Sequence, residues 1–459
     1  MAHNKDKVTW RAHYALMLLA IIYVMSYIDR LVISVLIEPI KAEFGASDTM
    51  IGLLTGVAFA IFYTGFGLPL GRLSDRIGRK TVIAVACVIW SILTMLSGVA
   101  TSFMILVLLR IGVAVGEAGA GAPSVAMISE LYPPRLRARA LAIFGLGPAV
   151  GAVLGIGFGG VLAEMYGWRA TFIIVGAPGI LIGLILAFTV KAPKQITTAS
   201  PGTADAGMLR TAQRLLRIPG FWQIVATGGA AAITGYAIQM WTPSFMIRSH
   251  QMSIQDAGML MGIGGGLLAV LGTLVCGYVT DTLAAKNPSW QLGTALLGTA
   301  LSIPLAMAFY LWPAGTAFML GSTAIPTGFL FYMGFAFFGV WWTVPCFSAM
   351  TRILPAHNLA QGTALFFMSV TLFGAGLGPV VAGIISDLLY STIGAEALRY
   401  ALVASASLLL IPCGFLISAI PKYRKQLLAT EAANADIAAS SSTKTSHINM
   451  AHDTKPAIS

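Results

Sequence analysis

Two adjacent charged residues, Asp29 and Arg30, lie inside an apolar stretch that is long enough to cross a bilayer. A spanning helix needs about 20 mostly apolar residues, and the stretch from residue 13 to residue 40 exceeds that length. An ionised side chain at the bilayer centre costs roughly 2.5–3.5 kcal/mol on insertion scales, so such charges usually face protein or water. Neighbours on a helix are about 100° apart, so we expect Asp29 and Arg30 to take different partners, in a structural or a functional ion pair.

A second pair of charges, Arg110 and Glu117, interrupts the apolar stretch at residues 103–129. Their spacing places them two helical turns apart on nearly the same face, about 10 Å along the axis. Glu117 falls near the depth of Asp29, and burial disfavours the charged form of a carboxylate, so Glu117 is a candidate to take up and release a proton. The alternative is a structural carboxylate bonded to Arg30.

The composition is that of a polytopic membrane protein. Of 459 residues, 57% are hydrophobic and 10% charged, whereas soluble domains contain about 25% charged residues. The net charge of +11 is spread over short loops, which indicates contact with lipid head groups and no nucleic-acid partner.

The four cysteines lie in apolar runs without ligand spacing, so we expect neither a metal nor a cofactor. The first apolar stretch is too long for a signal-peptide core, and we expect an uncleaved helix.

Twelve apolar stretches predict an all-α membrane protein, because lipid admits only helices and closed barrels. They lie near residues 13–38, 50–70, 81–100, 103–129, 140–163, 169–190, 219–247, 257–279, 291–311, 322–348, 361–386 and 397–420. Most of the 28 lysines and arginines lie at the N-terminus, in alternate loops and in the C-terminal tail. This distribution predicts that both termini are cytoplasmic, in an inner (plasma) membrane.

The twelve helices divide into two sets of six. We expect a cytoplasmic N-terminus (1–12), an N-terminal bundle (13–190), a linker (191–218), a C-terminal bundle (219–420) and a largely disordered cytoplasmic tail (421–459). The second part of the linker is predicted to be a short amphipathic helix, which either lies on the membrane surface or only joins the bundles.

An internal repeat relates the two halves. At one fixed offset, residues of the second helix recur in the eighth: Gly52, Gly56, Gly71 and Asp75 match Gly258, Gly262, Gly277 and Asp281. In the same way Gly145, Gly147 and Pro148 match Gly376, Gly378 and Pro379. Two pseudo-symmetric six-helix bundles are the plan of a transporter that rocks about a central site.

The loop after the second helix has the sequence GRLSDRIGRK, residues 71–80. It resembles the signature loop of the major facilitator superfamily, at Gly71, Asp75, Arg76 and Arg79 among others. The resemblance implies that Asp75 and its basic neighbours form a conformational latch between the bundles, on the cytoplasmic side of the outward-open state. The second copy keeps Gly277 and Asp281 but lacks the basic cluster, so we expect an asymmetric latch.

Within this superfamily, the first half resembles the Spinster-like branch. The likeness is carried by Asp29, Arg30, Arg110, Gly116 and Glu117. It implies proton-linked movement of sphingolipids or lysolipids, with Glu117 as a protonation or substrate-sensing site and Asp29 and Arg30 in the same network. The fifth helix, GLGPAVGAVLGIGFGG, also resembles the antiporter signature of drug exporters, although glycines at this spacing can serve close packing alone.

The second half offers an uncharged, aromatic wall. No charged residue occurs from residue 287 to residue 351. The candidates for the wall of a substrate cavity are Tyr236, Gln239, Trp241, Trp342 and Phe373. Aromatic residues of membrane proteins also face lipid or pack within a bundle. If these side chains face the centre, the cavity fits an amphipathic ligand with its head group toward the first half.

We therefore predict a secondary active transporter that uses alternating access and protons to move an amphipathic, lipid-like substrate. The alternatives are an organic-anion or drug transporter of the same superfamily and a sensor that does not transport. The sequence lacks the motifs of hydrolases and ATP-binding loops, so we expect no enzyme activity. The expected partners are a small-molecule or lipid-like substrate, protons and membrane lipids, and the expected state is a monomer.

Overall fold

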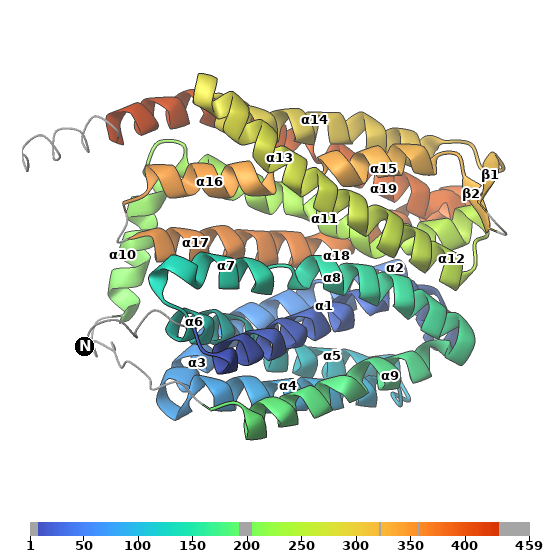
Figure 1. Cartoon of the computed structure of the whole chain (residues 1–459). Coiled ribbons are helices and arrows are strands. Elements are labelled where there is room, and N and C mark those ends of the chain that lie inside the picture. Colours follow the sequence, from blue (N-terminus) through green and yellow to red (C-terminus); the bar gives the residue numbers. More distant parts are fainter. Residues whose placement is uncertain (1–7, 192–203, 321–322, 356–357, 431–459) are drawn as a thin grey trace, which may run out of the picture.

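The computed structural model describes residues 8–191, 204–320, 323–355 and 358–430. These residues are almost all helical, which confirms the predicted all-α class. Figure 1 shows long helices running side by side, with the first half of the chain in blue to green beside the second half in light green through yellow to red. Of the predicted tail (421–459), residues 421–430 are helical, and the remainder lies outside the described residues, as do the linker residues 192–203.

The first half begins with α1, which Gly45 ends in a left-handed conformation (φ 63°). Its helices are α1 (Trp10–Phe44), α2 (Asp48–Thr55), α3 (Val57–Ile77), α4 (Arg79–Ser97), α5 (Phe103–Ala118), α6 (Gly121–Leu131), α7 (Pro134–Phe144), α8 (Gly147–Ala152), η1 (Val153–Phe158) and α9 (Gly159–Thr189). Several predicted spans are therefore built from two or more consecutive helical pieces.

The second half follows the same plan after the short helix α10 (Ala204–Leu216). Its elements are α11 (Phe221–His250), α12 (Ile254–Met259), η2 (Leu260–Gly265), α13 (Gly266–Lys286), α14 (Trp290–Leu311), α15 (Phe329–Phe338), α16 (Thr343–Ile353), α17 (Leu359–Ser369), η4 (Val370–Leu377), α18 (Gly378–Ile393), η5 (Gly394–Glu396) and α19 (Ala397–Ser407). Residues 410–430 are also helical.

Nine helical segments of the described chain are long and apolar enough to cross a membrane by length and composition. Two of these segments, residues 134–189 and 361–430, contain 56 and 70 residues. Each is broken by a glycine with positive φ, Gly167 in α9 (78°) and Gly394 before α19 (59°), so each contributes two crossings. Together with the 30-residue helix α11, the described chain contains the twelve predicted spans.

One predicted span begins too early in the sequence. The span expected at residues 322–348 starts with α15 at Phe329, because β1 (Ala317–Leu320) and β2 (Thr323–Pro326) form an antiparallel hairpin before it. Proline removes a backbone donor, and the residue before a proline is disfavoured in helical conformation. Pro326 therefore keeps Ile325 extended, and the helix begins only after it.

The two ends of the molecule differ in how their cores are built. We name them the hairpin end, which carries β1 and β2, and the α10 end, which carries α10 at the opposite side of Figure 1. At the hairpin end one hydrophobic core joins both halves, for example Leu36 of α1 with Phe245 of α11. At the α10 end each half has its own core, around Trp90 in the first and Met350 in the second.

Glycines that belong to the internal repeat bring the halves together at the hairpin end. A Cβ on Gly52 of α2 would lie 2.7 Å from the carbonyl oxygen of Pro379 in α18. A Cβ on Gly258 of α12 would lie 2.9 Å from Gly160 Cα in α9. Equivalent glycines of the two halves therefore make equivalent close contacts across the interface, as the repeat predicts.

Candidate functional site

The four intramembrane charges form two ion pairs between α1 and α5. Arg110 donates from Nη1 to Asp29 Oδ1 at 3.0 Å and from Nη2 to the carbonyl oxygen of Asp29 at 3.2 Å. Both residues are buried, with exposed fractions of 2% for Asp29 and 4% for Arg110. As the helical geometry predicts, Asp29 and Arg30 do not pair with each other.

Arg30 and Glu117 form the second pair. Arg30 Nε donates to Glu117 Oε2 at 2.5 Å, and Ser26 Oγ donates to the same oxygen at 2.8 Å. The Arg30 guanidinium carbon lies 4.4–5.1 Å from the ring centres of Tyr27, Phe59 and Tyr63, within the range of cation–π attraction. This arrangement is the bonded alternative of the sequence analysis, and the aromatic rings fix the position of Arg30.

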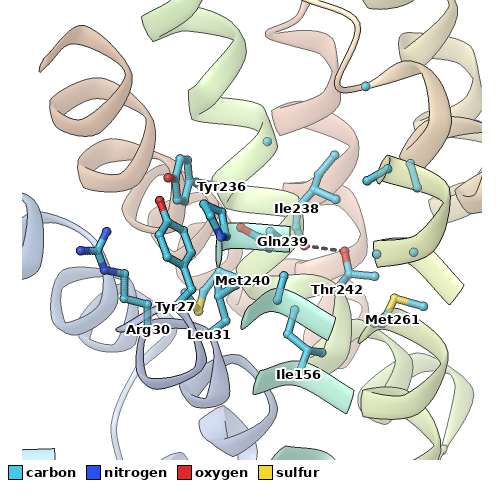
Figure 2. Close-up of a pocket in the computed structure, with 18 of the residues that line it drawn as sticks. Tyr27, Arg30, Leu31, Ile156, Tyr236, Ile238, Gln239, Met240, Thr242 and Met261 are labelled. Carbon is cyan, nitrogen blue, oxygen red and sulfur yellow. Dashed lines mark hydrogen bonds between the residues drawn. The ribbon is translucent and has the colours of Figure 1, made fainter. Parts of the chain in front are cut away.

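A cavity of about 460 Å³ lies between the halves, next to these pairs. Its charged lining residues are Arg30 and Arg110, both from the first half. Asp29 and Glu117 lie behind these arginines and do not line the cavity. The two carboxylates therefore do not border the cavity, because each is turned toward its arginine. Figure 2 shows Arg30 at one edge of the cavity, beside Tyr27.

The second half forms the opposite wall, which is uncharged. Of the predicted wall residues, Tyr236, Gln239 and Trp342 line the cavity. Trp241 does not: it is fully buried, and its Nε1 donates to Pro379 O at 2.9 Å. Gln239 and Trp241 are two residues apart and thus about 200° apart on α11, so they point to different sides of the helix.

Phe373 is the other predicted wall residue that lies outside the cavity lining. It belongs to the irregular segment η4, is half exposed and packs near Gly229 of α11. The lining also includes Tyr332 and Phe335 of α15. Their apolar rings continue the wall that Trp342 begins.

The residues of the predicted latch interact within the first half at the α10 end. Arg79 donates from Nη2 to Asp75 Oδ1 at 3.2 Å and also pairs with Glu130. Arg76 is exposed, and a Cβ on Gly71 would meet no atom within 4 Å. None of the described ion pairs of Asp75 or Arg79 reaches the second half.

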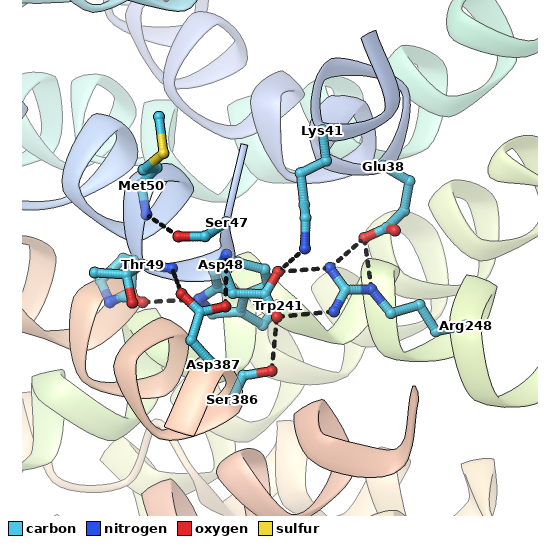
Figure 3. Close-up of polar contacts among 11 residues, drawn as sticks. Glu38, Lys41, Ser47, Asp48, Thr49, Met50, Trp241, Arg248, Ser386 and Asp387 are labelled. Atoms are coloured by element: carbon cyan, nitrogen blue, oxygen red, sulfur yellow. Dashed lines mark hydrogen bonds and ion pairs between the residues drawn. The ribbon is translucent and has the colours of Figure 1, made fainter. Parts of the chain in front are cut away.

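A polar network that the sequence analysis missed joins the halves at the hairpin end (Figure 3). Arg248 of α11 donates both terminal nitrogens to the carboxylate of Asp48, each at 2.8 Å, and its Nε to Glu38 Oε1 at 2.9 Å. Asp48 also pairs with Lys41 and accepts a hydrogen bond from Ser386 at 2.6 Å. Among the ion pairs of the described residues, those that cross between halves all involve Arg248.

Asp387 of α18 adds a contact to the beginning of α2. Its two carboxylate oxygens accept from the backbone N–H groups of Asp48 and Thr49 at 3.0 and 2.8 Å. A carboxylate at a helix N-terminus satisfies free donors and is favoured by the helix dipole. The sequence contains one signal of this network. Lys41 and Arg248 are among the few basic residues in loops that otherwise lack lysine and arginine, and acidic residues lie near both of them.

The sequence profile of the Major Facilitator Superfamily matches residues 19–379. The chain belongs to this superfamily. A "MFS-type efflux pump" of Mycolicibacterium smegmatis is 32% identical over 91% of this chain and 95% of its own. A "D-galactonate transporter" of Escherichia coli is 26% identical over 89% of this chain and 97% of its own.

A solved structure indicates which branch of the superfamily this chain resembles. A crystal structure of a bacterial homologue of the human lysosomal transporter Spinster, in an inward-facing and occupied conformation, matches with a TM-score of 0.79. It is 29% identical and covers 92% of this chain and 99% of its own. The chain is thus a Spinster-like integral membrane transporter of the superfamily and not an enzyme. Among the described residues, no cluster of histidine, cysteine, aspartate and glutamate could hold a metal ion.

Proposed function

We propose that this transporter moves an amphipathic, lipid-like substrate with an acidic head group and is driven by protons. The observation that carries the proposal is the asymmetry of the cavity. Its charged wall contributes only Arg30 and Arg110, whereas the facing wall is uncharged and rich in apolar rings. An arginine in a protein cavity is well suited to bind a carboxylate or phosphate, and the apolar wall is suited to bind a hydrocarbon tail.

Alternating access is supported by the difference between the two ends. The shared core and the Asp48–Arg248 pair close the hairpin end, and the separate cores leave the halves less connected at the α10 end. The distribution of lysine and arginine assigns the α10 end to the cytoplasm. On this assignment the structure is an inward-facing state, and transport requires the hairpin end to open.

Proton coupling follows from the charge balance of the two pairs. With both carboxylates ionised, Arg30 and Arg110 are neutralised and attract an anion weakly. If Glu117 takes up a proton, the pair with Arg30 gains a net positive charge at the edge of the cavity. An acidic head group then binds more tightly, so the proton and the substrate favour each other's binding.

A binding experiment at two pH values tests this proposal. Purified protein in nanodiscs is titrated with an acidic lysophospholipid (lysophosphatidylglycerol) and with zwitterionic lysophosphatidylcholine. We expect the acidic lipid to bind about tenfold more tightly at the lower pH, and the zwitterionic lipid to show little change.

Glu117→Gln should remove the pH dependence. Glu396→Gln, the same change at a carboxylate paired with Arg399 outside the cavity, is the matched control. Equal pH dependence in Glu117→Gln and the wild type would refute the proton-coupling role.

A second candidate substrate is a small organic anion without a tail. It is favoured by the cationic wall alone and by the relative described as a D-galactonate transporter. Galactonate as a competitor in the same titration separates the two: displacement of the lysolipid by galactonate at similar concentration favours the small anion. A drug substrate, suggested by the relative described as an efflux pump, predicts binding that does not depend on Arg30.

A further inference from the structure

A second, much smaller chamber adjoins Glu117. Its volume, counted as space for the centre of a water molecule, is about 10 Å³, which is room for about one water. Its walls come from four helices beside α5: Ser26 of α1, Tyr63 of α3, Gly121 and Ser124 of α6, and Phe144 of α7. Glu117 lines this chamber and does not line the substrate cavity, whereas Arg30 lines both.

One atom of Glu117 lacks a partner in this arrangement. Its Oε2 accepts from both Arg30 and Ser26, but its buried Oε1 has no hydrogen-bond donor among the described residues. An unsatisfied buried carboxylate oxygen is costly, so a bound water is expected where space and polar partners exist. The hydroxyl groups of Ser26, Tyr63 and Ser124 supply these partners around the chamber.

The chamber lies on the α10 side of Glu117. Ser124 follows Glu117 by seven residues, about 10 Å along the helix direction, toward the end where α6 meets α7. On α1, which starts at the α10 end, Ile22 and Ser26 of the chamber precede Arg30. The substrate cavity and the chamber thus reach the Arg30–Glu117 pair from different sides.

We propose that this chamber binds one water, which carries the proton between Glu117 and the α10 end by a route separate from the substrate cavity. The inference rests on the proposed proton coupling. In the transfer, the carboxyl O–H bond of Glu117 breaks as the chamber water accepts that proton. The same water gives one of its own protons to water at the α10 end, so the water is regenerated and Glu117 becomes a carboxylate.

Arg30 then links the two routes. Its Nε holds Glu117, and its guanidinium also borders the substrate cavity. The other charged and titratable groups around Glu117 are Asp29, Tyr23 and Tyr27 of α1, Tyr63 of α3 and Cys87 of α4. The substrate and the proton therefore act on one guanidinium without touching each other, and a ligand need not reach Glu117 to be coupled to it.

Filling the chamber tests the route. A Cβ on Gly121 would lie 3.4 Å from the Tyr63 hydroxyl oxygen, an ordinary contact distance, so Gly121→Ala places a methyl group in the chamber without a clash. Gly67→Ala of α3 adds the same methyl group where no atom lies within 4 Å and is the matched control. Ser124→Ala removes a polar partner of the water without adding volume and serves if Gly121→Ala fails to fold.

The measurement is time-resolved infrared spectroscopy after a pH jump, on full-length protein in nanodiscs without substrate. The carboxyl band that disappears in Glu117→Gln reports the protonation of Glu117. We expect Gly121→Ala and Ser124→Ala to slow the appearance of this band by about tenfold or more, with the wild-type final amplitude, while Gly67→Ala keeps the wild-type rate.

Two results would overturn the inference. One is a wild-type rate in both chamber variants. The other is a slower rate in Gly235→Phe, which projects into the substrate cavity where a Cβ meets no atom, equal to the slowing in the chamber variants. A band that is identical in Glu117→Gln and the wild type would instead show that Glu117 does not titrate, and would overturn the proton-coupling proposal itself.

Discussion

The hairpin end and the α10 end contain similar kinds of residues but connect them differently. At the hairpin end, Asp48 and Arg248 pair across the two halves and one apolar core continues between them. At the α10 end, Asp75 and Arg79 pair within the first half, and each half keeps its own core. A charge pair therefore stabilises one conformation only when its partners belong to bodies that move apart.

The largest effect on the balance between the closed and the open hairpin end is expected from inserting a bulky side chain at that end. A Cβ on Gly160 would lie 2.7 Å from the carbonyl oxygen of Ile254 and 3.0 Å from Gly258 Cα, and backbone atoms cannot rotate away. We expect Gly160→Leu to destabilise the closed hairpin end by about 3 kcal/mol, a roughly 100-fold shift toward the open state.

Spin labels on Met50 of α2 and Leu388 of α18, which are both exposed, measure the opening as a longer distance by electron–electron double resonance. Gly157→Ala is the control, because its added Cβ would meet no atom closer than 3.6 Å. An unchanged distance distribution in Gly160→Leu would show that this contact does not hold the end closed.

The second largest effect is expected from breaking the ion pair between Asp48 and Arg248, which joins the two halves. Asp48→Asn leaves Arg248, with 16% of its side chain exposed, without its bidentate carboxylate. Removing one partner of such a pair costs about 2 kcal/mol or more, a roughly 30-fold shift toward the open hairpin end. The same spin-label pair reports the shift. Glu396→Gln, whose ion pair lies within the second half, should leave the distance unchanged, and an equal response of both variants would contradict the prediction.

A smaller effect, which favours the closed hairpin end, is expected from a substitution at the α10 end. The family resemblance predicts that Asp75 latches the halves in the outward-open state, and here its side chain is 58% exposed. Asp75→Asn should therefore disfavour the open hairpin end by up to about 0.7 kcal/mol, roughly threefold. The measurement is made in the Asp48→Asn background, where the open state is populated enough to detect a decrease. An increase of the open state would refute the latch.

The smallest effect on the conformational balance is expected from Trp241→Phe. The Trp241 hydrogen bond to Pro379 joins α11 and α18 within the second half. Losing it should lower the free energy of unfolding by about 1 kcal/mol, seen as a lower thermal unfolding temperature in detergent. The distance between the labels on Met50 and Leu388 should not change. A shift of that distance would show that the second half does not move as one body.

The sequence predicted the parts of this structure that depend on one helix at a time. The twelve spans follow from hydropathy, and the depth of Asp29 and Glu117 follows from counting residues along a helix. The internal repeat identified Gly52 and Gly258, which make matching contacts across the interface. The boundary at residues 322–348 failed because a hairpin that ends in Pro326 carries no charged residue that would separate it from the helix after it.

Other features required knowledge of how helices are rotated against their neighbours. Helical periodicity separates Gln239 from Trp241 but does not tell which of the two faces the cavity. It also left open whether Glu117 was paired. The choice of Arg30 for Glu117 and of Arg110 for Asp29 depends on the register of α1 against α5.

Hydropathy, residue spacing and the loop motif thus predict a twelve-span transporter of the Major Facilitator Superfamily with charged residues inside its apolar spans. The packing of the helices places the arginines at the border of the substrate cavity with the carboxylates behind them, and it allows Asp48 and Arg248, 200 residues apart, to close one end. The packing cannot be read from the sequence because hydropathy and spacing describe a side chain relative to its own helix. Partners, cavities and closed ends arise from contacts between helices.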